Sequence, residues 1–317
     1  MPILKIKKED NKKRLDHFLV EKYPKESRSF WQKQIKGDLI LVNDKSVKVH
    51  QFLKEGDKIK ILKKSSSAHS QLDSKSKQAS QGGQKNKKLK KLKYKLLHED
   101  KHYLIVEKPA GLLTHSVKDE LGLADQIICD YPEIDKVGEE YRWGIVHRLD
   151  KGVSGVLLVA RSQTFFKYIK KQFKDRKIKK IYLALVYGAI EKDEGNIKFI
   201  IGRNKEGKMA ARPQESEGKE AITHFEVLEK FQNYTYLQIQ ILTGRTHQIR
   251  AHMLAYSHPV VGDVLYKIRK QKIKEPCELG RIFLHSHIIG FKNLDKKQVE
   301  YKSKLPAKLE KCLKELK

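Results

Sequence analysis

The chain has 317 residues, and its 68 lysines and arginines against 39 aspartates and glutamates give a formal net charge of +29. No stretch approaches the roughly 20 apolar residues of a membrane-spanning helix, and the first residues lack the apolar core of a secretory signal, so we expect a cytoplasmic protein without membrane contact. The excess of positive charge indicates a polyanionic partner such as nucleic acid, although solvated lysines in a lysine-rich chain would give the same count.

Cysteine and histidine spacings argue against cross-links and metal sites. The three cysteines stand far apart in the sequence, at Cys129, Cys277 and Cys312. This spacing suggests neither a disulfide framework nor a zinc motif. Two histidine pairs, His247 with His252 and His285 with His287, lack a glutamate or cysteine at ligand spacing. We therefore predict no disulfide framework and no metal site.

A basic, polar run divides the chain. Residues 63–95 hold 11 lysines and one aspartate, are rich in Ser, Gln and Gly, and contain few large apolar side chains. Such a segment buries too little surface to offset its chain entropy. We predict a flexible linker over 63–93 between an N-terminal module, 1–62, and a larger C-terminal module, 94–317. The linker is either a plain tether or a basic arm that touches phosphates.

The N-terminal module has the pattern of a small α+β unit. Apolar residues at helical spacing predict one helix that ends before Pro24 and a second over 28–36. Two β-rich runs flank Asn43 and Asp44, which is a hairpin signal, and a last strand covers 58–62. Exposed basic side chains on such a unit suit contact with phosphates.

The C-terminal module alternates many strands with few helices. Six runs show the period-2 alternation of strands: 102–108, 141–149, 154–161, 180–188, 222–230 and 234–242. Residues 163–176 have the apolar spacing of a helix. Because helices do not follow the strands regularly, we predict an α+β domain around a mixed, largely antiparallel sheet rather than a Rossmann-type fold. No glycine-rich nucleotide-binding motif is present.

Four polar motifs stand at predicted strand ends or turns, where functional sites are commonly built. They are Lys108–Gly111 (KPAG), His147–Asp150 (HRLD), Lys180–Tyr182 (KIY) and Thr243–Arg250 (TGRTHQIR). An ionised Asp150 could act as a nucleophile or base, with Arg250 holding it charged. The same pair could instead merely tie two loops together, and Tyr182 could be a core residue.

Together, KPAG, HRLDKGVSGVLLVAR, KIYLALVYG and TGRTHQIRAHM resemble the RluA-type pseudouridine synthase family over about residues 94–305. Residues 12–62, with RLDxxL, SR, VN and GD in order, resemble the S4 RNA-binding module. This combination is similar to RluC/RluD-like members, which modify large-subunit ribosomal RNA. The resemblance implies isomerisation of uridine to pseudouridine without a cofactor.

The resemblance also implies roles for single residues. Asp150 would be the nucleophile, Arg250 its partner, and Tyr182 the ring that packs on the flipped base. Arg148 would enter the RNA helix where that base leaves, and Leu284 would line the pocket. Further expected RNA contacts are His147, Lys108, Arg245 and His247 in the C-terminal module, and Arg28 and Lys33 in the S4-like module.

Some positions depart from the family pattern. Val153 replaces the usual threonine of HRLDxxTSG, so we expect the turn to survive with one hydrogen bond fewer. His115-Ser116 stands where HP is common, and the late FxHP motif is also changed. These departures leave a catalytically silent RNA-binding protein as an alternative, and a tRNA-directed synthase of the same family, which would share the chemistry, is a further one. No heptad pattern is present, and we expect a monomer.

Overall fold

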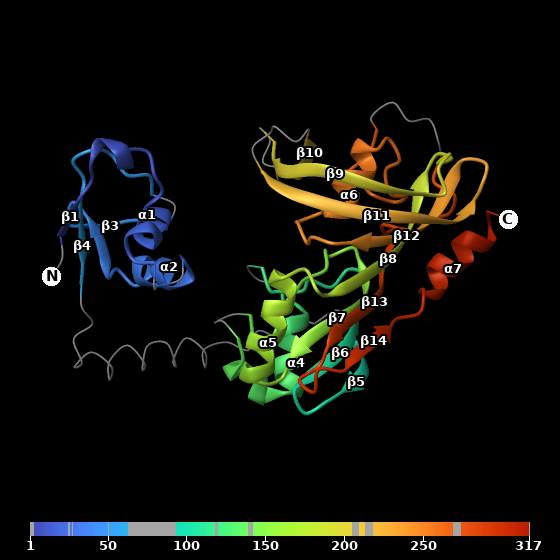
Figure 1. Cartoon of the computed structure of the whole chain (residues 1–317), viewed down its shortest axis with the longest axis horizontal. Helices are drawn as coiled ribbons and strands as arrows, with labels where there is room; N and C mark the ends of the chain where they lie inside the picture. The colour runs from blue at the N-terminus through green and yellow to red at the C-terminus, as the bar shows by residue number, and fades with distance from the viewer. Residues whose placement is uncertain are drawn as a thin grey trace. The chain divides into compact units, whose positions relative to one another are not determined.

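A computed structural model describes residues 3–24, 26, 28–49, 51–62, 93–117, 120–138, 142–204, 209–212, 218–268 and 274–316. The chain divides into two compact units, Met1–Lys88 and Leu89–Lys317 (Figure 1). Apart from its last residue, the linker predicted over 63–93 lies outside the described residues. Within the described ranges, no helix is long and apolar enough to cross a membrane.

The first unit packs two helices on a small antiparallel sheet. Its elements are β1 (Ile3–Lys5), η1 (Lys8–Asp10), α1 (Leu15–Lys22), α2 (Arg28–Lys36), β2 (Ile40–Val42), β3 (Lys45–Ser46) and β4 (Lys58–Ile61), and the strand order is β1-β4-β2-β3. The predicted helices and hairpin are confirmed. Apolar side chains from these elements, such as Leu15, Trp31 and Ile59, form one core. Arg28 and Lys33 lie in α2, but their side chains are outside the described residues.

The second unit is built on one large sheet with the order β10-β9-β11-β12-β8-β13-β7-β6-β5, and β14 pairs with β13. The strands are β5 (Lys95–Glu99), β6 (Tyr103–Lys108), β7 (Ser154–Ala160), β8 (Lys179–Tyr187), β9 (Glu194–Arg203), β10 (Met209–Arg212), β11 (Lys219–Lys230), β12 (Tyr234–Ile241), β13 (Leu284–Lys292) and β14 (Gln298–Lys302). Of these pairings, only β13 with β7 is parallel. The predicted mixed, largely antiparallel sheet is confirmed.

Helices cover the sheet where the strand faces are apolar. They are α4 (Leu123–Asp130), η2 (Pro132–Lys136), α5 (Gln163–Lys174), α6 (Gln248–Ala255) and α7 (Ala307–Lys314). Figure 1 shows α4 and α5 beside β6 and β7, whereas α6 lies near β9 and β11. Helix α5 buries Phe165, Phe166 and Ile169 on the face that its apolar spacing predicts.

The strand predicted over 141–149 is wrong. The described part of this segment forms turns, with a single antiparallel bridge from Ile145 to Val159. Gly144 has a φ of +70°, and a Cβ there would collide with the backbone oxygen of Ala160. The chain therefore crosses the edge of β7 closely instead of pairing along it, which frees the following residues to form a loop.

The cysteine spacing predicted no disulfide framework, but the structure contains one disulfide. Cys277 and Cys312 are bonded to each other, whereas Cys129 is free and exposed. The bond joins the segment before β13 to α7, beside a small apolar cluster that includes Leu279, Phe283 and Leu309. Sequence spacing hides this pairing because the two cysteines are 35 residues apart and meet only after β13 and β14 have folded back.

Candidate active site

Asp150 lies in a loop that is fixed from both sides before it enters β7. The Thr114 hydroxyl donates to the Leu149 carbonyl at 2.8 Å and accepts from the Leu149 N–H at 3.2 Å. The Val153 N–H closes the turn on the Asp150 carbonyl at 3.0 Å. The turn therefore forms with valine in place of the usual threonine, as expected.

The residues after this turn bring β7 against β13. Gly155 has a φ of +121°, and a Cβ there would collide with the backbone oxygen of Ser286, so only glycine permits this parallel approach. The Ser154 hydroxyl lies 2.9 Å from His285 Nδ1 and accepts from Arg281 Nη2 at 2.8 Å. Burial lowers the pKa of Arg281 to about 10. The serine and glycine of the HRLDxxxSG pattern thus anchor the loop below Asp150.

Gln248 organises the second motif at the start of α6. Its side-chain oxygen accepts from the Thr243 hydroxyl at 2.7 Å and from the Arg245 N–H at 3.0 Å. Its amide donates to the Ile222 carbonyl and the Thr223 hydroxyl, both at 3.0 Å. With this buried amide fully bonded, the chain turns sharply and starts α6, so that His247 and Arg250 lie beside Asp150.

Arg250 connects two carboxylates. Its Nη1 donates to Asp150 Oδ2 at 3.0 Å, while Nε and Nη2 form a fork on Asp263 at 2.6 and 2.8 Å. The Asp263 side chain is fully buried, whereas that of Asp150 is 20% exposed. Burial pulls the pKa of Arg250 down, but its bonds to the two aspartates outweigh burial and leave that pKa raised. A permanently charged guanidinium therefore faces the one carboxylate that a substrate can reach.

His247 and Tyr266 complete this side of the site. His247 Nδ1 lies 3.0 Å from the Tyr266 hydroxyl, which itself donates to the Met209 carbonyl at 2.9 Å. Nδ1 must therefore be the donor, and Nε2 faces Asp150 Oδ2 at 3.7 Å. Burial lowers the pKa of His247 despite the opposing charge of Asp150. The Arg250 guanidinium also lies over the Tyr266 ring, 4.8 Å from its centroid, in a cation–π contact.

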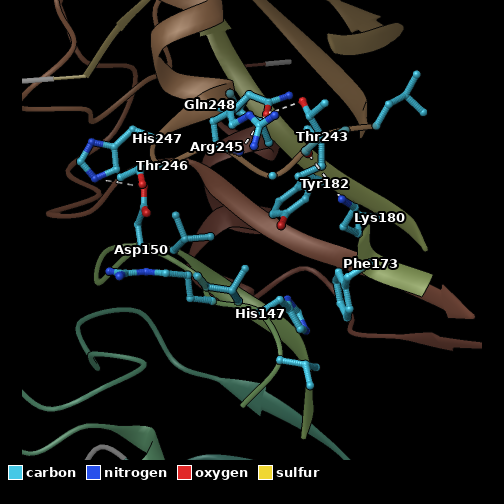
Figure 2. Close-up of a pocket in the computed structure, with 18 of the residues that line it drawn as sticks. His147, Asp150, Phe173, Lys180, Tyr182, Thr243, Arg245, Thr246, His247 and Gln248 are labelled. Carbon is cyan, nitrogen blue, oxygen red and sulfur yellow. Dashed lines mark hydrogen bonds and ion pairs between the residues drawn. The ribbon is translucent and has the colours of Figure 1, made fainter. Parts of the chain in front are cut away.

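These groups open into a cavity of about 660 Å³ (Figure 2). Tyr182 and Leu284 line it as nearly buried side chains, and burial raises the pKa of Tyr182. Among the described residues that line it, Asp150 is the only acid. Eight lining residues are cationic: Arg142, Arg148, Lys170, Lys174, Arg176, Lys180, Arg245 and Arg250. A cavity with one carboxylate and so many cations suits a polyanionic substrate.

Most of the residues selected from the sequence meet in this cavity. Those that line it are Asp150, Tyr182, Arg250, His147, Arg148, Arg245, His247 and Leu284. Lys108 does not. Its side chain is fully buried, and its ammonium donates to the carbonyls of Pro109, Leu112 and Lys151 at 3.0, 2.7 and 3.4 Å. This burial contradicts the expected RNA contact, and Lys108 instead joins the KPAG turn to the Asp150 loop.

Two important residues were not selected from the sequence. Asp263 and Tyr266 follow the apolar run Val260–Val261 and Gly262. That order repeats the pattern that singled out Asp150, an aspartate directly after a strand-like run, and could have drawn attention to them. In the part of the chain that the structure describes, no three histidine, cysteine or acidic side chains are arranged to hold a metal ion.

Comparison with known proteins agrees with this geometry. Residues 102–255 match the family model for RNA pseudouridylate synthases, and residues 13–59 match that of the S4 domain. The chain is 34% identical to an uncharacterized RNA pseudouridine synthase of Aquifex aeolicus, over 87% of this chain and 83% of the relative. It is 31% identical to ribosomal large subunit pseudouridine synthase C of Buchnera aphidicola, over 91% and 88%.

A solved structure agrees as well. Human RNA pseudouridylate synthase domain containing 1 superimposes with a TM-score of 0.55 and 28% identity, over 70% of this chain and 88% of the human chain. The matched regions include Asp150, Tyr182 and Arg250, which share one cavity. The family model and the relatives therefore agree with the fold, and the chain belongs to the RNA pseudouridine synthases, which are isomerases.

Proposed function

We propose that this enzyme isomerises specific uridines of large-subunit ribosomal RNA. The Buchnera relative is named for the large ribosomal subunit and matches along most of both chains. The S4 match adds a second RNA-binding unit, which suits a large structured substrate. The observation that carries the proposal is the Asp150–Arg250 pair in a cavity whose other charged side chains are all cationic.

Asp150 starts the reaction as an ionised carboxylate. Arg250 donates to one of its oxygens at 3.0 Å, so a fixed positive charge lies beside the carboxylate when a nucleotide is bound. Attack on the ribose or uracil, or removal of a ribose proton, needs this charged form. In the net isomerisation the N1–C1′ bond breaks, the uracil turns, and a C5–C1′ bond forms. N1 gains a proton and C5 releases one, so no electrons are exchanged with another molecule.

The target nucleotide leaves its stack to reach Asp150. The cavity walls near the carboxylate are Tyr182 and Leu284, which offer an aromatic face and an aliphatic face to a flipped uracil. Stacking on an aromatic side chain contributes ~1–3 kcal/mol, which offsets much of the cost of flipping. Arg148 is exposed and lines the cavity, so it is placed to fill the space that the base vacates.

The first experiment removes the carboxylate. Asp150→Asn keeps the size of the side chain and an oxygen that can accept from Arg250. We expect normal folding and RNA affinity but no tritium release from transcribed large-subunit RNA labelled at uridine C5. Asp295→Asn, at an exposed aspartate, is the matched control and should keep wild-type activity. Release at the wild-type rate by Asp150→Asn would reject this role.

A second experiment identifies the substrate. Pseudouridine positions would be mapped in total RNA from a strain that lacks the gene, and again after complementation with wild type or Asp150→Asn. Loss at large-subunit positions, restored only by wild type, is the expected result. Loss confined to transfer RNA would keep the chemistry and reject the proposed substrate, and no loss in any RNA would favour a silent RNA-binding protein.

A further inference from the structure

The cavity has two chemically different sides, and the proposed chemistry uses only one. Figure 2 shows Tyr182 between Asp150 and His247 on one side and Phe173, Lys180 and His147 on the other. All of these residues line the same cavity. The side with Phe173 has no group that the isomerisation requires, yet it is built from side chains that suit a nucleotide.

Two aromatic rings stack on each other on this second side. His147 and Phe173 stack with centroids 5.1 Å apart and planes at 27°. His147 Nε2 accepts the Leu158 N–H at 2.9 Å, so a neutral ring carries its proton on Nδ1. Burial lowers the pKa of His147 to about 3, which keeps the ring neutral. The pair is thus a fixed, uncharged stacking surface with one N–H donor.

Two lysines line the same cavity as the ring pair. Lys180 Nζ donates to the Thr243 carbonyl at 3.4 Å, and no carboxylate of the described residues forms an ion pair with it. Burial lowers the pKa of Lys180 to about 8. Lys174, at the end of α5, lines the same cavity, and the sequence of α5 contains no acidic residue. A bound phosphate would supply the negative charge that this side lacks.

We propose that this side of the cavity is a second nucleotide subsite, which binds the RNA residue next to the isomerised uridine. Its base would lie against the His147–Phe173 pair, and its phosphate would contact Lys180 and Lys174. This inference rests on the proposed function. Lys180 and Tyr182 are two residues apart on β8 and point to the same face, about 7 Å from each other. A nucleotide stacked at Tyr182 therefore brings its covalent neighbour within reach.

The stacking contact is tested by combining protein and RNA changes. The probe is a short RNA with the mapped uridine and its natural flanks, with the base of the 5′ or the 3′ neighbour removed in separate oligonucleotides. Phe173→Leu keeps an apolar side chain against the core but removes the ring. We expect removal of one of the two neighbouring bases to lower the single-turnover efficiency of wild type by about 5-fold or more.

The inference requires that the two losses are not additive. With Phe173→Leu, removal of that same neighbouring base should have a clearly smaller effect than in wild type, because one ring of the His147–Phe173 pair is already gone. Multiplicative losses on both the 5′ and the 3′ side would overturn the second subsite. Thermal melting and circular dichroism check that the variant is folded. If wild type forms no pseudouridine, the proposed function itself fails, which is a distinguishable result.

The phosphate contact has its own matched pair of variants. Lys174 lines the cavity, whereas Lys171, which is also exposed on the same helix, does not. Lys174→Met should reduce the slope of log affinity against log salt by about 0.7–0.9, the value for one lost phosphate contact. Lys171→Met should leave that slope unchanged. Equal reductions by both variants would indicate a diffuse basic surface and overturn the phosphate position.

Discussion

Asp263 holds Arg250 through two parallel hydrogen bonds, 2.6 Å from Nε and 2.8 Å from Nη2. The Asp263 carboxylate is itself fixed, because Oδ1 accepts the N–H groups of Leu265 and Tyr266 at 2.9 and 3.1 Å. Arg250 therefore has one remaining direction, and it points its Nη1 at Asp150. The buried Asp263 carboxylate thus sets the position of Arg250 relative to Asp150.

Replacing Asp263 should reduce catalysis more than substrate binding. Asp263→Asn keeps one acceptor for Arg250 but loses the charge and half of the fork, which costs about 1–3 kcal/mol. We expect a 10- to 100-fold lower single-turnover rate with an RNA affinity within about 3-fold of wild type. Asp193→Asn, at a surface aspartate paired with Lys230, is the control and should change neither value. An unchanged rate in Asp263→Asn would show that Arg250 does not need this anchor.

Replacing Lys108 should affect stability rather than RNA affinity. Lys108→Met keeps the length of the side chain but leaves three backbone carbonyls without their donor, at a cost of about 1–3 kcal/mol. Urea unfolding and RNA binding would be measured on the same preparation. Lys151→Met serves as the control, because its ammonium pairs with Glu120 and both side chains are about half exposed. A large loss of affinity by Lys108→Met at wild-type stability would restore the RNA contact expected from the sequence.

Stability should decrease as the solution becomes acidic, partly through His252. This side chain is fully buried, and burial lowers its pKa to about 4. The unfolded chain takes up the proton near pH 6.5, so the contribution of His252 is complete above that pH and is lost as pH falls through 4. The full loss is about 3 kcal/mol.

The measurement is the free energy of unfolding in urea at several pH values between 7.5 and 4.5. His252→Leu should give a flatter dependence than wild type, and His224→Gln, at a partly exposed histidine on β11, is the control variant. His285, whose pKa burial also lowers to about 4, contributes with the same sign and should remain visible in both variants. Identical slopes for wild type and His252→Leu would contradict this assignment.

Gly155 should be the least replaceable glycine near the site. Gly155→Ala places a methyl group on the backbone oxygen of Ser286 and should cost at least ~3 kcal/mol, because β7 and β13 must separate. Gly280 also has a positive φ but open space, so Gly280→Ala should cost only about 1 kcal/mol. Thermal denaturation compares the stability losses of the two variants. Equal losses would mean that the positive φ, and not the contact between β7 and β13, determines the cost of replacing Gly155.

Local patterns predicted much of this fold. Period-2 runs identified β6, β7, β8, β11 and β12, and the apolar face of α5 followed from its helical spacing. The run over 141–149 has the same composition but became a loop, since Gly144 must pass close to Ala160. That contact depends on tertiary structure, so the residue pattern does not contain it.

The site also combines residues that local patterns predicted with residues whose role depends on tertiary contacts. Asp150, Tyr182 and Arg250 stood out as polar residues at strand ends, and they do share one cavity. Asp263 was missed because its importance comes from a partner 13 positions earlier in the sequence, on another element. Lys108 was expected to contact RNA. Lysine is seldom fully buried, and its sequence pattern gave no sign of burial. Its burial depends on three carbonyls that converge only in the folded structure.

The position of β13 has a consequence for biosynthesis. β7 and β8 are neighbours in the sequence, but β13, which begins more than 90 residues after β8 ends, lies between them in the sheet. During synthesis, β7 and β8 are made before β13. Until β13 is added, they either stay unpaired with each other or form a non-native pairing. The sheet is therefore incomplete until β13 has been synthesised, and the cavity that Asp150 and Tyr182 share can form only after that strand has been added between β7 and β8.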